Sequence, residues 1–140
     1  MNEQDQAPLV KTAQPPVPAD LVAELTPKEI EDGKAFAILS YAAGFIGVPF
    51  LIVPLIMRDN AYSLYHAKQC LMLWIAGVIA VSVASASLLL CIGVVLLPAV
   101  GITVLVFDVI GLINALNGRM QPLPIIGKWG ENWFKGITKA

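Results

Sequence analysis

Side chains that can carry out catalysis are few in this sequence, and their spacing matches no known catalytic constellation. His66 is the only histidine, and Cys70 follows it by four residues. Two ligands do not complete a zinc site, which takes three or four from the protein. Ser82, Ser85 and Ser87 have no nearby histidine to activate them, and the sequence contains no phosphate-binding loop or nucleophile elbow. We therefore expect no catalytic residue, metal site, cofactor or enzymatic activity.

Asp108 is the most unusual residue, because it is the only charged side chain in the 46 residues from Leu71 to Leu116. A central aspartate costs a membrane helix roughly 2.5–3.5 kcal/mol on insertion scales. Its carboxyl group should therefore face a neighbouring helix or a wet cavity. Two interpretations stay open. Asp108 is either a proton or ion site in a polar pathway, or a packing residue bonded to a hydroxyl group such as that of Ser82 or Thr103.

His66 and Lys68 lie where the second apolar segment should begin, at the level of the membrane surface. There they would contact lipid headgroups or the end of the third helix. A simpler interpretation of Lys68 is that its aliphatic stem lies in the apolar region while its ammonium group reaches the headgroups. Both residues are candidates for partner contact.

Composition indicates the solvent of this chain. Of its 140 residues, 57% are hydrophobic and 14% are charged, whereas soluble domains carry about 25% charged residues. A chain of this length cannot hide so much apolar surface in one water-soluble core. The net charge of −1 gives no attraction to nucleic acid. We therefore predict an all-α integral membrane protein whose first partner is the lipid bilayer.

Three apolar stretches are long enough to cross a bilayer, which takes about 20 helical residues. They cover approximately residues 35–57, 69–90 and 95–117. Pro49 and Pro54 should kink or break the first of them. The predicted fold is a helical hairpin or bundle of about three transmembrane helices. The alternative is that the first stretch is re-entrant and crosses only part of the membrane.

The predicted turn between the second and third stretches lies around Gly93 and Pro98. We divide the chain into a disordered, acidic, proline-bearing tail (1–26), a transmembrane domain (27–120) and an interfacial C-terminal tail (121–140). With three crossings, the lysines and arginines favour an outside N-terminus and a cytoplasmic C-terminus. A re-entrant first stretch would reverse the N-terminal assignment.

Small residues recur every fourth position in the second stretch, at Ala76, Ala80 and Ala84. This spacing lets membrane helices approach closely, either within one chain or in a homo-oligomer. Cys70 and Cys91, if on one helix, are about 31 Å apart, too far for a disulfide.

Three motifs together resemble a family of small bacterial membrane proteins, the domain of unknown function "forty-eight-seventy". They are Tyr65-His66-Ala67-Lys68-Gln69, Gly111-Leu112-Ile113-Asn114-Ala115-Leu116-Asn117-Gly118 and Leu123-Pro124-Ile125-Ile126-Gly127-Lys128. That family is similar to the Tic-twenty component of chloroplast import and includes MamF-like proteins of the magnetosome membrane. Gln69 and Asn114 lie in these motifs and complete the candidate residues, whereas Asp108 lies outside them.

The resemblance implies a multi-pass protein of the bacterial inner membrane, or of an intracellular membrane such as that of a magnetosome. Together with the absence of catalytic groups, it predicts a non-enzymatic protein that organises or assembles with other membrane proteins or with copies of itself. The alternative hypothesis is a component of a Tic-like translocation or conductance pathway, because Asp108 lies inside a span.

Overall fold

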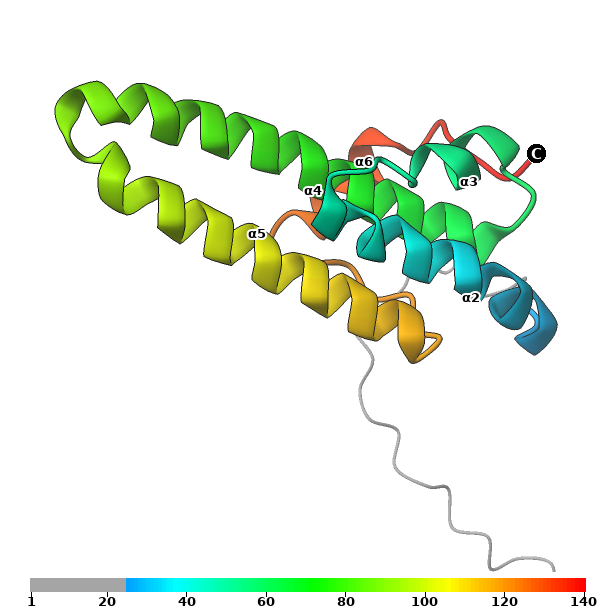
Figure 1. Ribbon diagram of the computed structural model, residues 1–140. Coiled ribbons are helices and arrows are strands. Elements are labelled where there is room, and N and C mark those ends of the chain that lie inside the picture. Colours follow the sequence, from blue (N-terminus) through cyan, green and yellow to red (C-terminus); the bar gives the residue numbers. More distant parts are fainter. Residues whose placement is uncertain (1–24) are drawn as a thin grey trace, which may run out of the picture.

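The computed structural model describes residues 25–140, so nearly all of the predicted tail lies outside the described residues. The described part of the chain is helical and contains no strand, which confirms the predicted fold class (Figure 1). In chain order the elements are α2 (Pro27–Ala42), η1 (Gly44–Ile46), α3 (Ile52–Met57), α4 (Ala61–Ala86), η2 (Ser87–Leu90), α5 (Gly93–Leu116) and α6 (Gly127–Trp133).

A long hairpin of α4 and α5 dominates the structure (Figure 1). Its two arms, Ala61–Leu90 and Gly93–Leu116, are the two described helices long and apolar enough to cross a membrane. Only 17% and 11% of their most apolar windows are buried inside the protein. The core helix of a soluble protein would be mostly buried, so these exposed apolar surfaces must contact lipid. The chain is therefore a helical membrane protein.

The turn of the hairpin lies at Cys91 and Ile92 rather than at Pro98. Cys91 adopts a left-handed conformation with φ of 60°, and a Cβ atom on Gly93 would lie 2.4 Å from the backbone nitrogen of Leu88. Glycine is thus required for the two arms to meet. Pro98 lies near the start of α5, where it deprives only one carbonyl of its usual N–H donor.

The first apolar stretch does not cross the membrane as one helix, which corrects the expected number of about three crossing helices to two. α2 ends at Ala42, and Gly47 then reverses the chain with φ of 75°. Pro49 cannot donate a backbone hydrogen bond, so the following helix, α3, starts afresh and runs back (Figure 1). The stacked rings of Phe36 and Phe50 join the two limbs.

Hydrogen bonds show that the residues before and after the first apolar stretch lie side by side at one end of the protein. The Asn60 side chain donates to the Glu29 carbonyl over 2.7 Å, and the Ala61 N–H donates to the Glu29 carboxylate over 3.2 Å. At the other terminus, the Ala140 N–H donates to the Arg58 carbonyl. The start of α2 and the C-terminus therefore lie at one end of the protein, as the re-entrant alternative required.

Charge is confined to this end, which we call the charged end and define as residues 25–34, 58–68 and 117–140. Among the described residues, every aspartate, glutamate, lysine and arginine except Asp108 belongs to it. The opposite tip of the hairpin is apolar, with Leu89 91% exposed.

Candidate functional site

His66 is enclosed by three tyrosine rings, those of Tyr41, Tyr62 and Tyr65, at centroid distances of 4.8–5.9 Å. Its Nε2 atom lies 3.0 Å from the Arg119 carbonyl, which can only accept. Nε2 must therefore carry the proton, and Nδ1 accepts from the Tyr41 hydroxyl over 3.5 Å. Nδ1 thus holds α2 against α4, and Nε2 holds the chain after α5 against α4. This contact fits the expected meeting of His66 with the end of the following long helix.

Gln69 joins two of the sequence motifs. Its Nε2 donates to the Gly127 carbonyl over 3.2 Å, and its Oε1 accepts from the Leu123 N–H over 3.2 Å. The Tyr65 hydroxyl, one turn earlier, donates to the Glu131 carboxylate over 2.9 Å. Residues after α5 are thereby fastened to α4 by buried polar contacts. The Gln69 amide matches a peptide group, which explains why an amide side chain suits this position.

Asn114 and Lys68 belong to the same packing. Asn114 is buried in α5, and its carbonyl accepts from the Tyr62 hydroxyl and from the Arg119 N–H. The Lys68 carbonyl lies 3.8 Å from where a Cβ atom on Gly130 would lie, so α6 packs closely on α4 at this level. Four of the five predicted residues, His66, Lys68, Gln69 and Asn114, are thus brought together near the charged end.

An ion pair closes the charged end. The Lys139 ammonium group lies 2.7 Å from the Glu29 carboxylate. Hydrogen bonding to Lys139, assisted by the Ala61 N–H and the Lys139 charge and opposed by burial, lowers the pKa of Glu29 below its usual value. A carboxylate at the N-terminus of α4 also complements the helix dipole.

This ion pair should make docking of the C-terminal residues dependent on pH. Because the folded-state pKa of Glu29 is lowered, its contribution is complete above the unfolded value of about 4.3 and disappears as pH falls through the folded value. The contribution should be under about 1 kcal/mol, because Lys139 is half-exposed. Hydrogen exchange at residues 137–140 should quicken on acidification. Lys139→Met should remove this pH dependence, whereas Lys135→Met should preserve it; equal behaviour of both variants would contradict the assignment.

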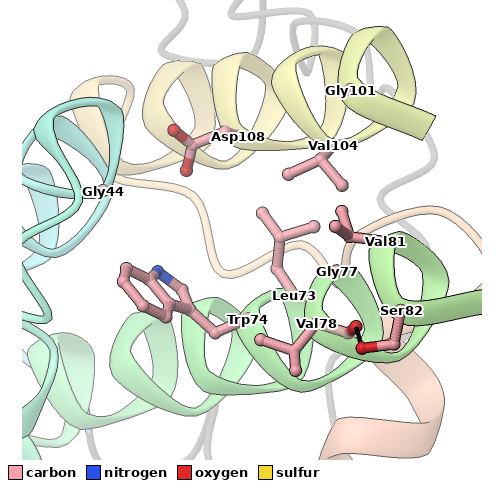
Figure 2. A pocket seen from close by; sticks show the side chains of 10 residues that line it. All are labelled: Gly44, Leu73, Trp74, Gly77, Val78, Val81, Ser82, Gly101, Val104 and Asp108. Carbon is pink, nitrogen blue, oxygen red and sulfur yellow. Dashed lines mark hydrogen bonds between the residues drawn. The ribbon is translucent and has the colours of Figure 1, made fainter. Parts of the chain in front are cut away.

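Asp108 lies in α5, eight residues before the end of that helix, and lines a pocket between α4 and α5 (Figure 2). It is 7% exposed, and no described residue forms a hydrogen bond with its carboxyl group. Ser82 and Thr103 donate instead to carbonyls of their own helices, those of Val78 and Ala99. Neither of these two hydroxyl groups bonds to Asp108 in the described part of the chain.

Trp74 and Gly44 complete the surroundings of Asp108. A Cβ atom on Gly44 would lie 3.7 Å from both Asp108 carboxyl oxygens and 3.7 Å from Trp74 Nε1. Sequence reasoning missed Trp74, although a signal existed. Trp74 and Asp108 lie 17 residues before and after Cys91, so a turn at Cys91 brings them level.

A cavity of about 410 Å³ opens beside these residues, between α4 and α5 (Figure 2). α2 packs against both arms of the hairpin, but it ends near Asp108, and the cavity continues the same groove towards the tip. Its lining residues are Gly44, Leu73, Trp74, Gly77, Val78, Val81, Ser82, Gly101, Val104 and Asp108. The arrangement is an apolar groove with one acceptor and one donor at its inner end.

These features define a small helical membrane protein with two helices long and apolar enough to cross a membrane, and with buried polar contacts that fasten the residues after α5 to α4. Among the described residues, no three histidine, cysteine or acidic side chains are grouped so as to hold a metal ion. Residues 32–130 match the magnetosome magnetite crystal formation protein family, MamF and MmsF, and the chain belongs to this family. The MamF-like part of the expected resemblance is thus confirmed.

Two relatives illustrate the match. The chain is 33% identical to magnetosome protein MmsF of Paramagnetospirillum magneticum over 90 residues, which are 64% of this chain and 78% of the relative. It is 35% identical to magnetosome protein MamF of Magnetospirillum gryphiswaldense over 95 residues, 67% of this chain and 82% of the relative. No solved structure matches the chain significantly.

Proposed function

We propose that this protein is a non-enzymatic scaffold of a magnetosome membrane, where it assembles with other membrane components that control crystal formation. Family membership and the names of the two relatives support this location. A cell-membrane location fits the same helices, since a magnetosome membrane is also a bacterial lipid bilayer. The eight lysines and arginines of the charged end favour a cytoplasmic position for that end.

One observation carries the proposal: the polar residues face inward and the apolar surface faces outward. The polar side chains of His66 and Gln69 are bonded within the chain, so little chemistry is left for a substrate. The tip half of the hairpin, by contrast, is exposed along both arms and is available to lipid or to other helices. Such a surface suits assembly in the membrane.

Conductance by a single copy has less support. Two crossing helices enclose no pathway among the described residues, and a polar pathway through lipid must be surrounded by protein. Asp108 is therefore better explained by contact with another protein surface than by transport through one chain.

The test is complementation. The tagged chain would be expressed in Magnetospirillum gryphiswaldense lacking its MamF, with the native MamF as positive control and an empty vector as negative control. We expect the protein in the magnetosome membrane fraction, crosslinked to membrane proteins, and crystal sizes shifted towards those of the native control. Correctly located protein at native abundance that forms no crosslinks and leaves crystal size unchanged would contradict the proposal.

A further inference from the structure

We propose that two copies of this chain pack hairpin against hairpin about a twofold axis parallel to the membrane normal, with Asp108 of each copy facing Trp74 of the other. The inference rests on the proposed assembly role and names its first partner and its surface. The contact lies in the groove between α4 and α5, beyond the end of α2 (Figure 2).

The groove is a continuation of an interface that the protein already uses. On the side of the charged end, α2 lies between α4 and α5 and packs on both. Beyond Ala42 the same groove is unfilled. A side chain added at Gly101 would meet no atom within 4 Å, so the backbone of α5 is bare at this point. Bare backbone of this kind lets a helix of another chain approach closely.

Polar atoms at the inner end of the groove require a partner. Asp108 is 7% exposed as a residue, and neither its carboxyl group nor the Trp74 indole N–H has a hydrogen bond among residues 25–140. No side-chain polar atom in this part of the chain is both fully buried and unbonded, so these groups open onto the groove. The Ser82 hydroxyl, also in the groove, is satisfied by Val78. Unmatched polar groups in an apolar setting are costly. One acceptor on α5 and one donor on α4 therefore remain open to the groove.

Asp108 and Trp74 lie at the same depth along the hairpin, and this makes the groove complementary to the groove of a second copy. A Cβ atom on Gly44 would touch both Asp108 and Trp74, so acceptor and donor lie at the same depth on opposite walls. All copies share one orientation, because each charged end stays on the same side of the membrane. A twofold axis along the membrane normal preserves depth and places α4 of one copy opposite α5 of the other. The donor of each copy then faces the acceptor of its partner, twice per dimer.

Disulfide trapping tests the geometry. Two differently tagged copies would be co-expressed in native membranes, both with Cys91→Ser, one with Val78→Cys and the other with Val104→Cys. Both positions line the groove on opposite walls. The matched control replaces Val78→Cys by Ile79→Cys, which is equally exposed on α4 but does not line the groove. We expect at least tenfold more inter-tag disulfide for the Val78 pair than for the Ile79 pair.

Removal of the polar pair tests its chemistry. Trp74→Phe and Asp108→Leu should each lower trapping by roughly three- to tenfold, the range for one or two interhelical hydrogen bonds in a membrane. Combining them should cost no more than either alone, and Asp108→Asn, which keeps an acceptor, should restore most of the trapping. Circular dichroism and thermal unfolding of each variant establish that the chain is folded.

The outcomes separate this inference from the proposed function. Equal trapping by Val78 and Ile79, or trapping unaffected by both polar substitutions in folded protein, would overturn the groove dimer. Lysine-directed crosslinks to other membrane proteins in that case would leave the scaffold role standing. Absence of crosslinks to any protein, including a second copy, would remove both.

Discussion

Cysteines placed at Glu31, Asp59 and Lys135 are expected to react with a membrane-impermeant maleimide from the same side of the membrane. All three positions are exposed and belong to the charged end. The reason is the reversal between α2 and α3, which returns the chain to the Glu29 backbone by way of Asn60. The effect is all-or-none, because a crossing first stretch would place Glu31 on the side opposite to Asp59.

Labelling would be done on single-cysteine variants carrying Cys91→Ser, in sealed vesicles and after their permeabilisation. Cys70 is buried and should stay silent, as the parent without an added cysteine would show. The native Cys91 gives the opposite control, since it lies exposed at the far tip. A Glu31→Cys variant that reacts only from the side accessible to Cys91 would refute the re-entrant arrangement.

Gly111→Val should disrupt the packing of α2 against α5. A Cβ atom at Gly111 would lie 2.3 Å from the ring of Tyr41, which is 1% exposed and held by its contact with His66. Overpacking of this kind costs up to about 3 kcal/mol, and here it separates α2 from α5. We expect a loss of about this size in the free energy of unfolding, measured by denaturant titration in mild detergent.

The same substitution at Gly101 is the matched control. This glycine lies in the same helix, ten residues earlier, and an added side chain meets no atom within 4 Å. Gly101→Val should therefore change the stability of the single chain by no more than roughly 0.5 kcal/mol, the scale of the helix-propensity difference. Similar losses at both positions would show that the Tyr41 contact is not the cause.

The two long apolar helices could be predicted from the sequence because their length and lack of charge were sufficient evidence. No helical periodicity of apolar residues was needed. An apolar run of 46 residues with one charge must fold as two arms if lipid is its solvent. The first stretch was harder, since its length fits a crossing while Gly47 and Pro49 favour a reversal. Only the tertiary contacts of Glu29 with Asn60 and Ala61 decide between these outcomes, and such contacts leave no local pattern.

For the candidate residues, too, some properties could be predicted from the sequence and others depended on tertiary contacts. The sequence singled out Asp108 as a group that needs special surroundings, but those surroundings depend on where α2 ends. His66 was expected to contact lipid headgroups or the end of the third helix, and it binds the Arg119 carbonyl just after α5. Gln69, a candidate for partner contact, binds the Gly127 carbonyl and the Leu123 N–H of the same segment. Their partners are backbone atoms, which any residue type supplies, so composition could not identify them.

The apolar turn at Cys91 has a consequence for biogenesis. If the charged end stays on the side of synthesis, no charged loop has to be carried through the hydrocarbon layer. Leu88–Ile92 contains no charge, and among residues 25–140 every charged side chain but Asp108 lies in the charged end. The helices α4 and α5 can insert into the bilayer together as a hairpin. The unfavourable part of the insertion free energy then comes mainly from the Asp108 carboxyl group. In that arrangement the part of the hairpin that reaches the far side is a short cap of leucine, cysteine and isoleucine.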